Sequence, residues 1–168
     1  MSLTGRGLAS LGVLVSLGLL GCSGHESKIT ATANLSASLT GDLPANPLQW
    51  KVITSTIDKK NSTMSTLYGN DLAVSYARTH ARHEYPAGTR LSLVTWTQQE
   101  DPRWFGAKIP NQVQSVEFVS VVVTVDGRQS FSYQKYEGTP LKNVSSQEKA
   151  AATAREAYLL SLRAAVMP

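Results

Sequence analysis

The sequence is poor in the side chains that most often bind metals or act as nucleophiles. One cysteine, Cys22, and three histidines occur in 168 residues. A lone cysteine cannot form an internal disulfide or supply the thiolates of a zinc or iron–sulfur site. Neither a G-x-S-x-G turn nor a glycine-rich phosphate loop is present. We therefore expect no metal site, and no nucleophile–base pair can be proposed.

Charge is also scarce and evenly spread. Charged residues make up 17% of the chain, and the formal net charge is +4 at pH 7. Nucleic-acid-binding domains usually carry a concentrated basic stripe with interleaved aromatic side chains. The basic residues of this sequence form no such stripe. We therefore expect no nucleic-acid partner.

The apolar run near the N-terminus is too short to span a bilayer comfortably, but it has the length of a signal-peptide core. Residues 8–20, LASLGVLVSLGLL, follow Arg6 and lead into Gly21 and Cys22. The ending LLGC resembles the lipobox of bacterial lipoproteins, in which the cysteine takes a diacylglycerol after the preceding peptide is removed. We predict a lipoprotein signal peptide over residues 1–21 and lipidation of Cys22, which would anchor the chain to a membrane. The alternative is an ordinary secretory signal that ends near a cysteine by chance.

The residues after Cys22 suggest a location and a tether. Ser23 follows the cysteine and no aspartate does; by resemblance to the sorting rule of Gram-negative bacteria, this favours the outer membrane, facing the periplasm. Residues 22–46 are rich in serine, threonine, alanine and asparagine and nearly free of large apolar side chains. Such composition predicts a flexible tether. Residues 47–168 then have the size of one small domain.

Hydrophobic alternation predicts a mainly antiparallel β-sheet with two helices, an α+β fold. Asn70 or Asp71 is expected to cap a short helix after the second strand, and Ser145 with Glu148 a longer C-terminal one. The inward stripe of the second helix is expected to be Ala151, Ala154, Tyr158 and Leu162. The strands are expected over residues 50–57, 63–69, 89–96, 112–125 and 130–136.

Two histidines lie on the expected short helix. Leu72, Tyr76, His80 and His83 are spaced by four, four and three residues, so they would share one face. His80 and His83 could bind haem or a metal from this face. The alternative is that they extend a partly buried stripe and interact with the helix dipole. Two histidines without a third donor make an incomplete zinc site, which favours this structural interpretation.

Glu117 and an aromatic pair are the other candidate site residues. Glu117 lies within an apolar strand, where a carboxylate could act as a proton acceptor in a pocket. We favour a structural ion pair with an arginine such as Arg90. Trp104 and Phe105 lie in what is expected to be a long loop over residues 97–111, where they would line a ligand mouth or cover the core.

Three stretches taken together resemble the cytochrome P460 family. They are WKVITSTIDKKNSTMSTLYGNDLAVSYAR, YPAGTRLSLVTW and VEFVSVVVTVDGRQSFSY, and the resemblance spans about residues 48–137. It implies a β-rich domain that forms a homodimer and holds a c-type haem. It also implies oxidation of hydroxylamine or, as in the related cytochrome c′-beta proteins, binding of nitric oxide.

The chain departs from the family at the haem attachment site. Family haem is bound through Cys-x-x-Cys-His near the C-terminus, but here no cysteine follows Cys22 and no histidine follows His83. Members with a lysine–haem cross-link need a lysine on the pocket sheet, and residues 89–96 contain none. We therefore expect no covalent haem.

These observations leave three functional hypotheses. The leading one is an envelope lipoprotein whose domain binds a small or apolar ligand or a partner; we expect enzyme activity, as a haem oxidoreductase, only if non-covalent haem is bound. The alternative is a redox or gas-binding protein that holds haem non-covalently through His80 or His83. The third is a structural envelope lipoprotein that uses its sheet only for dimerisation.

Overall fold

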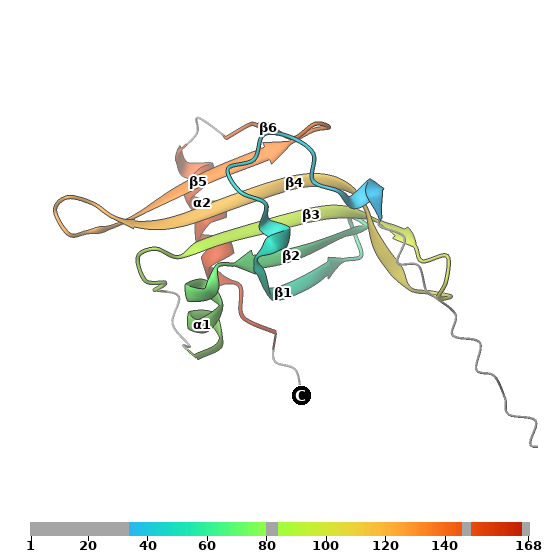
Figure 1. Ribbon diagram of the computed structural model, residues 1–168, viewed down its shortest axis with the longest axis horizontal. Helices are drawn as coiled ribbons and strands as arrows, with labels where there is room; N and C mark the ends of the chain where they lie inside the picture. Colours follow the sequence, from blue (N-terminus) through green and yellow to red (C-terminus); the bar gives the residue numbers. More distant parts are fainter. Residues whose placement is uncertain (1–33, 80–83, 146–148, 166–168) are drawn as a thin grey trace, which may run out of the picture. The chain divides into compact units, whose positions relative to one another are not determined.

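The computed structural model describes residues 34–79, 84–145 and 149–165. Six strands form one antiparallel sheet in which each strand pairs with its neighbour in sequence, in the order β1-β2-β3-β4-β5-β6 (Figure 1). This confirms the predicted α+β fold with a short helix after the second strand and a C-terminal helix. The elements are η1 (Leu35–Ala37), η2 (Pro47–Gln49), β1 (Lys51–Asp58), β2 (Thr63–Gly69), α1 (Asp71–Thr79), β3 (Arg90–Glu100), β4 (Lys108–Val123), β5 (Gln129–Glu137), β6 (Lys142–Asn143) and α2 (Lys149–Ser161).

The turns between the strands follow from local side-chain chemistry. Asp58 closes the β1–β2 turn by accepting hydrogen bonds from the backbone N–H groups of Lys60 and Asn61. Gly127 turns β4 into β5 with a φ of 78°, which favours glycine because it has no Cβ. The predicted Asp-Gly hairpin is therefore confirmed.

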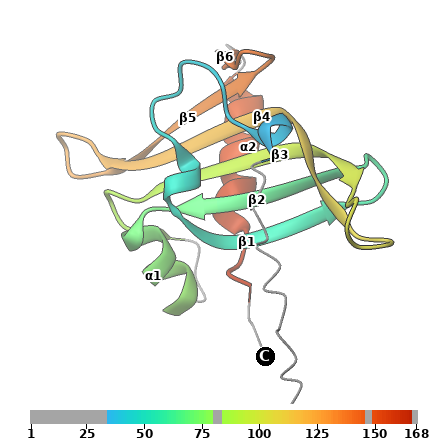
Figure 2. The same ribbon diagram turned by 45° about the vertical axis from the view of Figure 1, so that its right-hand side comes forward.

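One face of the sheet, here called the helix face, is covered by α1 and α2. Its buried side chains alternate along the strands, as the two-residue period of a strand requires. Leu159 and Leu160 of α2 and Ala73 and Val74 of α1 pack into the same core, and α2 lies behind the strands in Figures 1 and 2. The strand residues of this core are Ile53, Leu67, Leu91, Leu93, Val119 and Val121.

The opposite face, here called the segment face, is partly covered by the chain that precedes β1. Residues 34–50 cross this face in front of the strands (Figure 2). The indole Nε1 of Trp96 donates to the Ala37 carbonyl at 3.0 Å, and the Leu141 N–H donates to the Thr40 carbonyl at 2.7 Å. The apolar side chains beneath are Val94, Trp96, Val116, Phe118, Tyr136 and Leu141.

The structure differs from the expected tether over residues 34–46. Leu39, Leu43 and two alanines of this stretch pack against the core of the segment face. Few apolar side chains are enough here because the sheet supplies most of the apolar surface that becomes buried. The predicted signal peptide, Cys22 and the first part of the tether lie outside the described residues.

The expected long loop over residues 97–111 is mostly a β-hairpin. β3 continues to Glu100 and β4 begins at Lys108, and these two residues pair in the ladder. At the end of a two-stranded ribbon neither face is buried, so the side chains there are polar. The hydrophobic pattern of the sequence therefore does not reveal that the strands continue. Only residues 101–107 form the connection.

The inward faces of both helices also differ from the predicted stripes. In α1 the buried residues are Ala73 and Val74, whereas Leu72 is exposed. In α2 the buried residues are Leu159 and Leu160, and Tyr158 is exposed. Within residues 34–79, 84–145 and 149–165, neither helix has the length and apolar character needed to cross a membrane.

Candidate functional site

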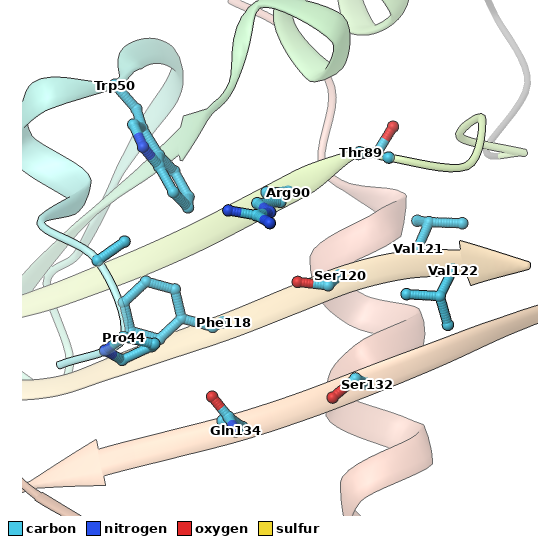
Figure 3. Close-up of a pocket in the computed structure, with 12 residues that line it drawn as sticks. Pro44, Trp50, Thr89, Arg90, Phe118, Ser120, Val121, Val122, Ser132 and Gln134 are labelled. Atoms are coloured by element: carbon cyan, nitrogen blue, oxygen red, sulfur yellow. The ribbon is translucent and has the colours of Figure 1, made fainter.

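A cavity of about 550 Å³ opens on the part of the segment face that residues 34–50 leave uncovered. Its floor is a row of polar side chains that the strand register aligns: Arg90 of β3 faces Ser120 of β4, which faces Ser132 of β5. Gln134 belongs to the next row on β5 (Figure 3). These four side chains place hydrogen-bond donors on three adjacent strands.

Asn70 fixes the backbone of Arg90. Its side-chain oxygen accepts a hydrogen bond from the Ala73 N–H at 3.0 Å, which makes Asn70 the cap of α1. The same oxygen accepts from the Arg90 N–H at 3.2 Å, and the Asn70 N–H donates to the Arg90 carbonyl at 3.1 Å. The start of the helix and the start of β3 are therefore locked together at the edge of the cavity.

Aromatic side chains form one wall of the cavity. The rings of Trp50 and Phe118 meet edge to face, with centroids 6.1 Å apart and planes at 80° (Figure 3). Phe118 in turn packs against Tyr136 at 5.8 Å. Edge-to-face packing on both sides holds the Phe118 ring in place. The remaining wall includes Pro44 and Ala45 of the N-terminal segment and Val122 of β4.

The electrostatic character of the cavity is positive. Arg90 is the only charged residue in its described lining. Within the residues that the structure describes, its guanidinium makes no salt bridge and no hydrogen bond. A guanidinium beside hydroxyl and amide donors is suited to a carboxylate or another planar anion. The aromatic wall is suited to an apolar or aromatic body attached to that anion.

A second polar group lies on the helix face. Glu117 is only 3% exposed, and its two carboxylate oxygens lie 3.0 and 2.7 Å from one guanidinium nitrogen of Arg155 in α2. The expected ion pair is therefore present, but its partner is Arg155 and not Arg90. The reason is the period of the strand: Arg90 faces the same side of the sheet as Ser120, whereas Glu117 faces the opposite side.

Tyr133 completes this group. Its hydroxyl is buried beside the ion pair and forms no hydrogen bond of ordinary geometry with the described residues. Burial, and next the negative charge of Glu117, raise the pKa of Tyr133 from 10.0 to about 12. The guanidinium of Arg155 partly opposes this rise. The phenol is thus held in its neutral form.

The raised pKa of Tyr133 predicts a loss of stability in strong base. Because the folded state favours the neutral phenol, its contribution is complete below the unfolded pKa of 10.0 and disappears as the pH rises toward about 12. The free energy of unfolding should therefore fall more steeply in this window for the wild type than for Tyr133→Phe. Urea denaturation at a series of alkaline pH values measures this difference.

The structure brings together only some of the candidate residues from the sequence. His80 and His83 lie outside the described residues. Trp104 and Phe105 neither line the cavity nor cover the core, since both are exposed at the end of the β3–β4 hairpin. The described residues contain no cluster of three or more histidine, cysteine, aspartate or glutamate side chains that could hold a metal ion.

Comparison with known proteins identifies the domain. The family model described as Cytochrome P460 matches residues 44–153. This match covers more than half of the chain. The chain belongs to the cytochrome P460 family. It therefore contains a haem-related domain, and the resemblance seen in the sequence is confirmed. No curated protein matches the chain.

The described lining of the cavity offers no ligand to a haem iron. Haem iron takes an axial ligand from histidine, cysteine, methionine or tyrosine. Residues 34–79, 84–145 and 149–165 contain no histidine or cysteine, and their one methionine, Met64, packs into the core of the segment face. None of the four residue types occurs in the described lining of the cavity. Tyr133, on the other face, would have to ionise to bind iron, and its raised pKa opposes this.

The polar floor of the cavity is the feature that sequence reasoning missed. Every second residue of β5 from Ser130 to Gln134 is polar, so one face of this strand carries Ser130, Ser132 and Gln134. On the neighbouring strand β4, Ser120 pairs with Ser132. Such an alternation indicates a face that is not filled by apolar side chains. The position of Arg90 in this row depends on strand register, which the sequence alone does not provide.

Proposed function

We propose that this chain is an envelope lipoprotein whose P460 domain binds a small anion with an apolar or aromatic body. The observation that carries the proposal is the exposed guanidinium of Arg90, which pairs with no described residue and lies beside the aromatic wall of a cavity. Lipidation of Cys22 and attachment to the outer membrane, facing the periplasm, belong to the same proposal and rest on the sequence LLGCS. The homodimer that the family resemblance implies stays a prediction.

The size and chemistry of the cavity support a small organic ligand. A volume of about 550 Å³ lies within the range of pockets that bind small molecules. Trp50 and Phe118 offer ring surfaces for stacking or edge contacts, and Arg90 with Ser120 and Ser132 offers donors to a carboxylate. No side chain in the described lining is an acid or a base of the kind that general acid–base catalysis uses at neutral pH. The lining is therefore suited to binding, and we propose no reaction.

The test uses benzoate as a probe and benzamide as its neutral counterpart. Isothermal titration should show that benzoate binds more tightly than benzamide, because only benzoate carries a charge for Arg90. Arg90→Gln should weaken benzoate binding by about 10- to 100-fold, the value of one charge-assisted hydrogen-bond group. Arg128→Gln, which removes an exposed arginine at the β4–β5 turn, should leave binding unchanged. Equal binding of benzoate by the wild type and Arg90→Gln would contradict the proposal.

A haem-based function is the second candidate, and membership of the cytochrome P460 family is the observation that favours it. In this case haem is held without covalent attachment, with His80 or His83 as the ligand, and the protein acts in redox chemistry or gas binding. Purification from cells supplied with haem tests this candidate. A Soret band that disappears in His80→Ala or in His83→Ala supports it. A colourless protein that takes up no haemin excludes it. If this protein also binds no carboxylate, the structural lipoprotein hypothesis is favoured.

A further inference from the structure

The end of the β3–β4 hairpin exposes two large aromatic side chains. Trp104 is 70% exposed and Phe105 is fully exposed. They lie next to each other in the connection over residues 101–107, beyond the last ladder pair of Glu100 and Lys108. Isolated exposed apolar side chains are common, but an adjacent tryptophan and phenylalanine at the tip of a hairpin form a small patch with a large apolar area.

Hydrogen bonds within residues 101–107 hold the connection in a defined turn. The Asp101 N–H donates to the Ala107 carbonyl and the Ala107 N–H donates to the Trp104 carbonyl, each at 3.0 Å. Gly106 has a φ of 78°, which lets the chain turn directly after Phe105. The Asp101 side chain accepts from the Arg103 N–H at 2.8 Å and closes the turn from inside. The two rings therefore project from a hydrogen-bonded turn.

The charges around the tip are paired locally. Arg103 lies 3.5 Å from the carboxylate of Asp101, and Lys108 pairs with Glu100 across the ladder. The tip therefore has no net charge within residues 100–108. Its affinity for any surface should come from the apolar rings and should depend little on salt.

The chain enters the described domain at the same end. The side-chain amide of Asn34, the first described residue, donates to the Pro110 carbonyl at 2.6 Å, two residues into β4. Cys22 precedes Asn34 by 12 residues, and 12 residues cannot reach further than about 40 Å even when fully extended. A lipid anchor on Cys22 would thus hold this end of the hairpin within about 40 Å of the membrane.

We infer that the tip of the β3–β4 hairpin inserts Trp104 and Phe105 into the interfacial region of the membrane that carries the anchor. This inference rests on the proposed lipidation of Cys22. Tryptophan and other aromatic side chains are favoured at the boundary between headgroups and acyl chains. The anchor and the hairpin tip then form two attachments at one end of the domain.

Such attachment would hold the cavity at a distance from the membrane. Arg90 lies ten residues along β3 from Glu100, which corresponds to about 33 Å of strand. The β4–β5 turn, near the cavity, and the β3–β4 tip lie at opposite ends of the sheet (Figure 1). The ligand cavity would therefore open toward the aqueous compartment.

The test uses the full-length protein, purified from cells after processing and reconstituted into phosphatidylcholine vesicles with brominated acyl chains. Brominated chains quench tryptophan only at short range, and Trp50 and Trp96 lie within the domain. We expect quenching of part of the emission, loss of that part in Trp104→Tyr, and reduced quenching in Phe105→Ser. Added salt should leave the quenching unchanged. Val125→Ser, which changes an exposed residue at the opposite end of the sheet, should quench like the wild type.

Two outcomes would overturn the inference, and they differ in what they say of the anchor. Vesicle-bound protein with a diacylglycerol on Cys22 but without Trp104-dependent quenching leaves the anchor and removes the insertion. An unmodified Cys22, seen by mass spectrometry, removes both. Benzoate binding by Trp104→Tyr measures the ligand proposal separately, because Trp104 does not line the cavity.

Discussion

Replacement of Arg155 by methionine should lower the free energy of unfolding by about 2–4 kcal/mol. Glu117 is almost completely buried, and both of its oxygens depend on a single nitrogen of Arg155. Removal of the guanidinium leaves a buried carboxylate without its partner, which is usually more costly than the pair itself is stabilising. The expected loss is below that of a fully enclosed pair because the Arg155 side chain is 43% exposed, so water can reach the vacated position.

The same geometry predicts an asymmetry between the two partners. Glu117→Leu should cost little, because Arg155 can turn toward water and leucine suits the apolar surroundings. The double variant Glu117→Leu with Arg155→Met should recover most of the stability lost in Arg155→Met alone. Urea denaturation of the four proteins gives the coupling energy, with Arg128→Met as a surface control. Equal losses in the two single variants would show that Glu117 is not isolated when its partner is removed.

The Glu117–Arg155 pair also shows where sequence reasoning ends. Glu117 interrupts an apolar strand, so the sequence predicts an ion pair, and an arginine partner is the right kind of residue. The partner itself could not be identified, since Arg155 lies 38 residues away on a helix whose apolar pattern placed Ala151, Ala154 and Tyr158 inward. Arg155 faces the sheet because a carboxylate on another element pairs with it. The apolar periodicity of the helix contains no information about that carboxylate.

Local features were predicted more successfully than long-range ones. The cap at Asn70 and the turn at Asp126 depend on side chains within a few residues, so short motifs reveal them. The polar stretch over residues 34–46 is different. Its order depends on the exposed apolar surface of a sheet formed by residues that follow it in the chain. Composition alone therefore predicted a tether where the structure has a covering segment.

Replacement of Gly41 by alanine should lower the free energy of unfolding by about 2–5 kcal/mol, by separating the covering segment from the sheet. Gly41 has a φ of 140°, and a Cβ at this position would lie 2.7 Å from the Leu141 nitrogen. Neither backbone can give way without loss of the hydrogen bond from the Leu141 N–H to the Thr40 carbonyl. The strain of the positive φ and the steric overlap therefore add, and the segment should move away from Trp96.

Gly127→Ala provides a matched control for this prediction. Gly127 also has a positive φ, of 78°, but no atom lies within 4 Å of the added Cβ, so the variant should lose only the strain, about 1–2 kcal/mol. A greater loss in Gly41→Ala, with tryptophan emission shifted to longer wavelength, would show that the close approach to Leu141 holds the segment in place. Because Pro44 and Ala45 form part of the cavity wall, Gly41→Ala should also weaken benzoate binding, whereas Gly127→Ala should not. Equal stability losses in the two variants would mean that the segment and the cavity wall do not depend on this contact.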